Sequence, residues 1–300
     1  MMSITGFNWA DPRDNYATDD LAPSGLKPGY SPADAAATAQ AVARGLAAAN
    51  PGRVTAIRMP INPATTSDPT WWPSYRAAID AVIQNGQKVI LGYWEANKDG
   101  LIDDQAAFDR MWDVVEAEYG NNGSVLFEPM NEPFGYSAAD WTNTAASWLA
   151  RHPVDPGRVI IDGTGYSENV VPVGQDPRLA GTMLGLHIYP KWAESSRQQW
   201  IDNFDRRIGD FAARVVVTEF GAPMTTGTVY AGPDQQSSND VYYLQAVASR
   251  ITDLGLGSVY WPGLRDGDQY SMTVRSGEKA DISLQVTNQS AIDLWRSGSG

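Results

Sequence analysis

The sequence predicts an α/β protein that folds as a single (β/α)₈ (TIM) barrel, and three observations support this prediction. Eight short runs of apolar or β-branched residues alternate with helix-like segments along the 300-residue chain. Most of these runs are continuously apolar, as strands that are covered on both faces require. Neither a linker nor a change in composition divides the chain, so we expect one domain over residues 1–300.

The predicted strands are defined by these apolar runs. They cover residues 3–9, 53–61, 88–94, 124–132, 158–163, 182–189, 214–221 and 257–263. A doubly wound parallel sheet is the alternative, but that fold usually carries a glycine-rich turn after its first strand. The segment GFNWADPRDN contains a single glycine at this place, and we therefore favour the barrel.

Helix signals lie between the strands. The first helix is expected to begin at Ser31 and Pro32, a capping residue followed by proline at the first helical position. The second is expected to stop at Asn85 and Gly86, just before the next strand. Further helices are expected over residues 103–119, 138–150, 195–212, 239–254 and 289–296. The connection 164–181 lacks a helical pattern and is expected to be mostly loop.

The composition excludes several classes of partner. The chain has 22 basic and 35 acidic residues, a net charge of -13, and no basic cluster, so nucleic acid is not an expected partner. No apolar stretch approaches the length of a membrane-spanning helix, and no membrane partner is expected. Because the chain has no cysteine, disulfides and thiol chemistry are excluded.

Polar and aromatic residues collect at the carboxyl ends of the predicted strands, where a barrel of this kind places its functional groups. They are Asn8, Trp9, Arg58, Trp94, Glu95, Asn131, Glu132, His187, Tyr189, Glu219 and Trp261. Closing a barrel requires none of these side chains. We therefore expect a functional site at this end of the barrel.

Two of these residues, Glu132 and Glu219, form a pair that glycosidic bond cleavage requires. One carboxylic acid protonates the departing oxygen, and one carboxylate acts on the other side of the sugar carbon. A separation of about 5–5.5 Å allows direct attack and retention of configuration, whereas about 6.5–9.5 Å leaves room for water and inversion. The sequence leaves both separations open. A cation such as Arg58 would keep one carboxylate ionised while the other keeps its proton.

Five short motifs fall at the predicted strand ends. They are IRMP at 57–60, MNEP at 130–133, HIYP at 187–190, VTEFG at 217–221 and YWPG at 260–263. Together and in this order, they resemble the motifs of clan A glycoside hydrolases, most closely the cellulase-like retaining glycosidases of family 5.

The resemblance implies a double-displacement mechanism in which Glu132 is the acid/base and Glu219 is the nucleophile. It also implies that Asn131 binds the 2-hydroxyl of the sugar, and that Arg58 and Tyr189 steady Glu219. His187 would contact the reacting region and Trp261 would form the floor under the sugar.

The resemblance makes endo-β-1,4-glucanase-like cleavage of a polysaccharide or oligosaccharide the default expectation. An exo-acting β-glycosidase on another sugar remains open, as does a carbohydrate-binding barrel without activity. The expected partner is thus a carbohydrate. We also expect a monomer that is secreted, with its export signal outside the sequence, since the opening residues lack the regions of a signal peptide.

The end of the third strand departs from the family pattern. Family 5 members usually carry histidine there, whereas this chain reads GYWEANKDG. We expect Trp94 to be a sugar platform. Glu95 either binds sugar hydroxyls or faces solvent. We count both residues among the substrate-binding set.

Glu128 receives a different interpretation from Glu132. Strand alternation places the two on the same face, with Glu128 roughly 13 Å deeper in the barrel. A buried carboxylate has to be paired, so we expect Glu128 to be a structural partner of Arg58.

No metal or organic cofactor is expected. The chain contains two histidines, His152 and His187, which cannot form a clustered histidine set for zinc. A serine nucleophile of the G-x-S-x-G type has no matching motif either.

Overall fold

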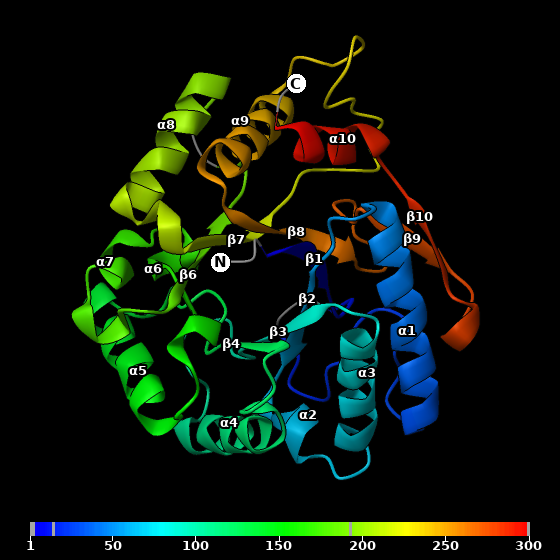
Figure 1. Ribbon diagram of the computed structural model, residues 1–300, viewed down its shortest axis with the longest axis vertical. Helices are drawn as coiled ribbons and strands as arrows, with labels where there is room; N and C mark the ends of the chain where they lie inside the picture. Colours follow the sequence, from blue (N-terminus) through cyan, green and yellow to red (C-terminus); the bar gives the residue numbers. More distant parts are fainter. Residues whose placement is uncertain (1–3, 14–15, 192–193, 299–300) are drawn as a thin grey trace.

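The computed structural model describes residues 4–13, 16–191 and 194–298, and its centre is a ring of parallel strands (Figure 1). The strands pair in the order β4-β3-β2-β1-β8-β7-β6-β5. The parallel pairing of β1 with β8 joins the first and last strands of the ring. The doubly wound alternative is therefore wrong, and the predicted (β/α)₈ barrel is confirmed.

All eight predicted strands are present. They are β1 (Thr5–Trp9), β2 (Ala56–Ile61), β3 (Lys88–Tyr93), β4 (Val125–Glu128), β5 (Ile160–Asp162), β6 (Met183–Ile188), β7 (Val215–Phe220) and β8 (Gly257–Leu264). Residue 3, the first of the predicted strand 3–9, lies outside the described residues. Every residue of β2, β6 and β7 is buried, in accordance with their continuous apolar runs.

Helices follow the strands around the outside of the ring (Figure 1). The longer ones are α1 (Pro32–Ala49), α3 (Trp72–Gln84), α4 (Gln105–Tyr119), α5 (Ala138–Arg151), α8 (Arg197–Ile208), α9 (Asn239–Leu254) and α10 (Gln289–Ser297). Four of them begin after serines whose hydroxyls accept a hydrogen bond from a backbone N–H of the first turn. These serines are Ser31, Ser137, Ser196 and Ser238.

Shorter helical turns fill the remaining connections. They are α2 (Pro63–Ser67), α6 (Thr164–Ser167), α7 (Val171–Gly174), and the 3₁₀ turns η1 (Pro156–Arg158), η2 (Pro177–Leu179), η3 (Gly209–Arg214) and η4 (Lys279–Asp281). The connection after β5 contains only single turns, as its lack of helical pattern predicts. The expected helix 195–212 divides at Gly209, whose φ of 51° ends α8 and starts η3.

The bottom of the barrel is an apolar plug. Each strand region contributes one side chain to a buried cluster near the amino ends of the strands. Its members are Ile4, Ala56, Ile90, Leu126, Ile160, Met183, Val216 and Val259. Since side chains two residues apart along a strand face the same side, the next inward positions include Arg58, Glu128 and Asp162. Polar groups therefore lie directly above an apolar floor.

Two features of the fold differ from the predictions. First, β4 ends at Glu128 rather than at residue 132, because β4 and β5 meet at the single bridge Phe127–Val159 and then separate. The estimated depth of Glu128 below Glu132 is therefore wrong, since it assumed an extended strand between them. Second, the strands β9 (Thr273–Ser276) and β10 (Ser283–Val286) form an antiparallel hairpin beside α1, which was not predicted.

No helix among the described residues combines the length and the apolar character that crossing a membrane requires. The extent of the domain, residues 1–300, remains a prediction.

Candidate active site

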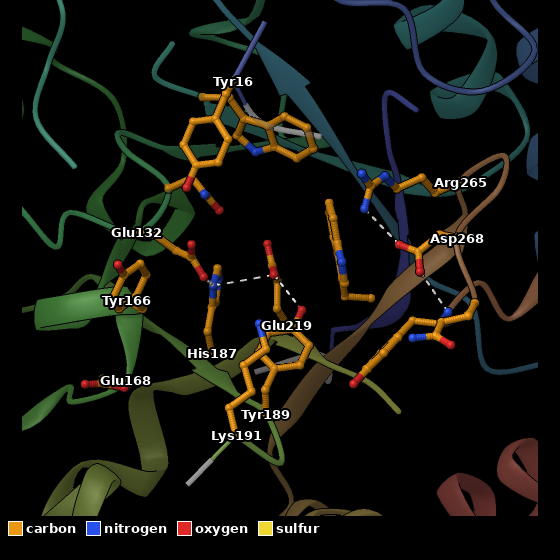
Figure 2. A pocket seen from close by; sticks show the side chains of 15 residues that line it. Tyr16, Glu132, Tyr166, Glu168, His187, Tyr189, Lys191, Glu219, Arg265 and Asp268 are labelled. Carbon is orange, nitrogen blue, oxygen red and sulfur yellow. Dashed lines mark hydrogen bonds and ion pairs between the residues drawn. The ribbon is translucent and has the colours of Figure 1, made fainter. Parts of the chain in front are cut away.

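A cavity of about 600 Å³ opens among the loops that follow the carboxyl ends of the strands. Its lining residues are Tyr16, Trp94, Asn131, Glu132, Tyr166, Glu168, His187, Tyr189, Lys191, Glu219, Trp261, Arg265, Asp268, Gln269 and Tyr270. Figure 2 shows Glu132, His187 and Glu219 converging in the middle of this set. The cavity is therefore a mixed aromatic and acidic site in a largely apolar barrel.

Arg58, on β2, lies beneath the cavity and joins its acidic groups. It is 2% exposed, and each nitrogen of its guanidinium donates hydrogen bonds. Nε and Nη2 bind the two oxygens of Glu128 at 2.5 Å each, and Nη1 binds Glu219 Oε1 at 2.6 Å. Nη2 also binds Asn131 Oδ1 at 2.6 Å, and Nη1 binds Asn8 Oδ1 at 2.9 Å. Burial opposes the charge of Arg58, but the Glu128 and Glu219 carboxylates outweigh it and raise its pKa.

The prediction that Glu128 pairs with Arg58 in the core is confirmed by this two-fold contact. Glycine makes room for it, because a Cβ on Gly92 would lie 3.1 Å from Glu128 Oε2. The fork of the guanidinium matches the two carboxylate oxygens, which is the strongest geometry for such a pair.

Glu219, near the end of β7, is held on both oxygens. Oε1 accepts from Arg58, and Oε2 accepts from the hydroxyl of Tyr189 at 2.7 Å. Burial raises the pKa of Glu219, whereas His187, Arg58 and the Tyr189 hydrogen bond act to lower it. The side chain is thus fixed in position with its charge partly balanced.

Glu132 lies on the loop after β4. Its backbone is left-handed with φ of 48°, which is uncommon for a residue with a side chain. Its Oε1 lies 2.9 Å from Nδ1 of His187, on β6. Burial lowers the pKa of His187 to about 4, so the imidazole is neutral near pH 7 and the contact is a hydrogen bond rather than an ion pair.

The two glutamates are close together. His187 Nδ1 lies 3.6 Å from Glu219 Oε2, and one oxygen of Glu132 lies within 4.8 Å of one oxygen of Glu219. The sequence alone does not determine this distance between the two carboxylates.

Two groups of side chains have the spacing of metal ligands in the described part of the chain. They are Glu128, Asp162 and His187, and Glu132, His187 and Glu219. Arg58 already binds both oxygens of Glu128 and one of Glu219, so a guanidinium supplies the positive charge that a cation would bring. We assign no metal to either group.

Trp94 and Trp261 form the aromatic part of the cavity. Their ring centroids lie 5.6 Å apart with an angle of 57° between the planes. Glu95, by contrast, is absent from the lining and is 2% exposed. Its carboxylate accepts the backbone N–H groups of Lys98 at 2.7 Å and Gly100 at 3.3 Å. The expectation that Glu95 faces solvent is therefore wrong, and its carboxylate holds its own loop instead of lining the cavity.

The structure brings most of the predicted site residues to one place. Seven line the cavity: Trp94, Asn131, Glu132, His187, Tyr189, Glu219 and Trp261. Arg58 lies below them and contacts Glu219 and Asn131 rather than the open space. Asn8 also lies below, and its amide donates to backbone carbonyls of β7 and β8.

Sequence reasoning missed the lining residues that come from loops. They are Tyr16, Tyr166, Glu168, Lys191, Arg265, Asp268, Gln269 and Tyr270. No strand-end rule points to them, because they lie beyond the strands. Asp162 was also missed, although it is the last residue of β5 and the strand-end rule would have found it.

Comparison with known proteins gives one family and many structural relatives. The family model for cellulase (glycosyl hydrolase family 5) matches residues 42–263. No curated protein sequence gives a significant match.

Solved structures share the whole fold at low sequence identity. Cel5A (EG2) from Hypocrea jecorina (Trichoderma reesei) is 16% identical with a TM-score of 0.65, covering 97% of this chain and 98% of that one. A triple mutant of an endo-beta-1,4-glucanase from Xanthomonas axonopodis pv. citri is 16% identical with a TM-score of 0.64, covering 99% of both chains. XacCel5A in complex with cellopentaose is 15% identical with a TM-score of 0.60, again covering 99% of both.

The family match spans most of the chain, including the strands that carry Arg58, His187 and Glu219 and the loop that carries Glu132. The chain belongs to glycosyl hydrolase family 5, and it is a glycoside hydrolase.

Proposed function

We propose that this glycoside hydrolase is a retaining endo-β-1,4-glucanase in which Glu132 is the acid/base and Glu219 is the nucleophile. The observation that carries the proposal is that one carboxylate oxygen of Glu132 and one of Glu219 lie within 4.8 Å of each other. Carboxyl groups whose oxygens approach this closely favour the separation of about 5–5.5 Å found in retaining enzymes over the about 6.5–9.5 Å of inverting ones.

In the first step, an oxygen of Glu219 bonds to the anomeric carbon while Glu132 gives its proton to the departing oxygen. In the second, Glu132 takes a proton from the water that attacks the same carbon, and Glu219 is released. Arg58 and Tyr189 hold Glu219 at both oxygens, so its orientation is set before the sugar arrives. His187 holds the carboxyl of Glu132.

The remaining predicted residues take supporting roles in this proposal. Asn131, whose Oδ1 accepts from Arg58, would donate from its amide nitrogen to the 2-hydroxyl of the sugar. Trp261 and Trp94 provide apolar faces on which a pyranose ring stacks.

An exposed aromatic platform supports endo action. Tyr166, which follows β5, is 48% exposed and lines the cavity. Its ring stacks on that of Phe134, with centroids 4.3 Å apart and an interplanar angle of 19°. Figure 2 shows Tyr166 beside Glu132. Because the acid protonates the leaving oxygen, a sugar on Tyr166 belongs to the leaving group, which an enzyme that cuts within a chain has to bind.

Exo action on a β-glycoside is the second candidate. Arg265 and Asp268, paired at 2.8 Å, lie on the side of the cavity away from Glu132 (Figure 2). If this pair closes the cavity on this side, it limits how many sugar units fit on the side of the cleaved bond opposite to the leaving group.

A carbohydrate partner is supported by the family and by the cellopentaose complex of a structural relative. Secretion, a monomeric state, and the exclusion of nucleic acid and membrane partners remain expectations from the sequence and the substrate class.

The products decide between the two candidates. We expect cellopentaose to be cut at internal bonds, and the viscosity of carboxymethyl cellulose to fall before much reducing sugar appears. Chromatography of the products and viscometry measure this. Release of single terminal units at almost constant viscosity would favour exo action, and a barrel without activity would release nothing from any β-glycoside.

Replacement of the nucleophile tests the mechanism. Glu219→Ala should lower kcat at least about 10³-fold on an aryl β-cellobioside, because no covalent intermediate can form. Added azide should restore turnover and give a glycosyl azide of inverted configuration, which NMR identifies. Glu278→Ala, an exposed glutamate paired with Lys27, is the matched control and should behave as the parent protein. Full activity of Glu219→Ala would remove the assignment.

The acid limb of the pH profile reports on Glu219, which has to be ionised to attack. The Tyr189 hydrogen bond lowers the pKa of Glu219, so Tyr189→Phe lets this pKa rise. A larger protonated fraction then exists at a given low pH, and the acid limb of kcat/KM should move to higher pH. Tyr270→Phe removes a neighbouring hydroxyl without this bond and should leave the limb in place. An unmoved limb in Tyr189→Phe would contradict the role of Tyr189.

If Tyr166 binds a sugar of the leaving group, its contribution to kcat/KM depends on the length of the substrate. Tyr166→Ala should lower kcat/KM on cellopentaose about 3- to 10-fold, the value of one aromatic stacking contact. An aryl β-cellobioside, which places no sugar on the leaving-group side, should be affected little. Val274→Ala, with the same 48% exposure on β9, is the control and should change neither value. Equal losses on both substrates in Tyr166→Ala would argue against a leaving-group site.

A further inference from the structure

Asp162, the last residue of β5, is a fully buried carboxyl beside Glu132 that the proposed mechanism does not use. Its Oδ2 accepts the backbone N–H of Glu132 at 3.2 Å and the hydroxyl of Ser167 at 2.5 Å. The same oxygen lies 3.7 Å from Nε2 of His187, whose other nitrogen contacts the Glu132 carboxyl. Asp162 therefore lies beside both the backbone and the side-chain contact of Glu132.

The backbone of Glu132 needs such a contact. Its left-handed conformation is unfavourable for a residue with a Cβ, and it persists only where neighbouring groups hold it. The preceding N–H, that of Asn131, donates to the carbonyl of Tyr93 at the end of β3 at 2.9 Å. The N–H of Glu132 points toward β5 instead and donates to the carboxyl of Asp162. Two successive amides thus tie the loop to β3 and to β5.

The gap in the barrel explains why a side chain makes the second tie. In a continuous parallel sheet, a backbone carbonyl of the next strand accepts such an N–H. Here β4 and β5 separate after the bridge between Phe127 and Val159. The carboxyl of Asp162 reaches across this gap and replaces the missing carbonyl.

The space around Asp162 is shaped for this carboxyl. A Cβ on Gly185 of β6 would lie 2.2 Å from Asp162 Oδ1, so a larger residue at that position would displace it. Ser167, also at positive φ, directs its hydroxyl to Asp162 from the loop after β5. Gly185 of β6 and Ser167 of the connection after β5 therefore position Asp162, which in turn contacts Glu132.

We propose that Asp162 is a positioning residue for the acid, which holds Glu132 in its left-handed conformation and so places the carboxyl at the leaving oxygen. This inference rests on the proposed role of Glu132. Asp162 itself touches neither the sugar nor the reacting atoms.

Asparagine provides a conservative replacement. Burial, followed by the charge of Glu128, raises the pKa of Asp162 well above its usual value, which favours the neutral carboxyl. A neutral carboxyl and an amide have the same shape, and each offers one oxygen to the N–H of Glu132 and the hydroxyl of Ser167. Alanine offers none.

The test uses two substrates that differ in their need for an acid. A dinitrophenyl β-cellobioside releases its dinitrophenolate without protonation. Cleavage of a cello-oligosaccharide requires protonation of the departing sugar oxygen. Asp162→Ala should lower kcat/KM on the cello-oligosaccharide about 10- to 100-fold, as a small displacement of a reacting group does, and by less than about 3-fold on the dinitrophenyl substrate. Asp162→Asn should stay within about 3-fold of the parent on both.

A double variant separates positioning from stability. If Asp162 acts through Glu132, then Asp162→Ala added to Glu132→Ala should cause no further loss on either substrate. A further loss in that background, or equal losses on both substrates in the single variant, would overturn the inference. The ratio of the two kcat/KM values does not depend on how much enzyme is folded. If Asp162→Ala gives no folded enzyme, Ser167→Ala carries the same test, with a selective loss expected and an equal or absent loss contradicting it.

Two controls complete the experiment. Asp104→Ala removes another carboxylate that accepts a backbone N–H, at the start of α4, and should change neither kcat/KM value. Glu132→Ala alone tests the proposed function, because equal losses on both substrates would remove Glu132 as the acid. A selective loss in Glu132→Ala together with an unselective one in Asp162→Ala would overturn only the role of Asp162.

Discussion

The buried guanidinium of Arg58 is the interaction on which the site depends. A guanidinium has five N–H groups, and here they meet acceptors from Glu128, Glu219, Asn131 and Asn8. A charge in a barrel interior is tolerated only when it is paired and fully hydrogen-bonded. The same bonds that stabilise Arg58 orient Glu219, the proposed nucleophile, and Asn131, which precedes the proposed acid, so one side chain links the stability of the core to the geometry of the site.

The group formed by Arg58, Glu128 and Glu219 has a net negative charge, which disfavours a further charged carboxylate beside it. One guanidinium faces two carboxylates, and a third charge at Asp162 would be unpaired at the same depth. Burial and the charge of Glu128 raise the pKa of Asp162 accordingly, and burial keeps His187 neutral. The apolar ring below excludes water from this layer, which strengthens both effects. Asp162 is neutral because of burial and the charge of Glu128, whereas His187 is neutral because burial outweighs the carboxylates around it.

The sequence predicted the repeating parts of this structure well. Continuous apolar runs located all eight strands, and the strand-end rule located seven residues of the cavity. The strand-end rule could not predict Tyr166 or Asp268. These side chains lie outside the strands, and the folding of their connections, which brings them to the cavity, leaves no periodic pattern in the sequence. Glu95 was misplaced for a related reason. Its position at a strand end resembled a functional one, but the turn that follows presents two N–H groups that capture its carboxylate.

Both catalytic candidates lie where the regular barrel is interrupted. Val217 packs with the outer core, so strict alternation would turn Glu219 outward as well. The pairing of β6 with β7 shifts between Leu186 and His187, and this irregularity lets Glu219 reach Arg58 inside the barrel. Glu132 lies past the end of β4, where the sheet has opened toward β5. A perfectly regular barrel would present neither carboxylate in this way, so local irregularity brings the pair together, and Arg58 and Asp162 are the groups that hold the two irregular segments in place.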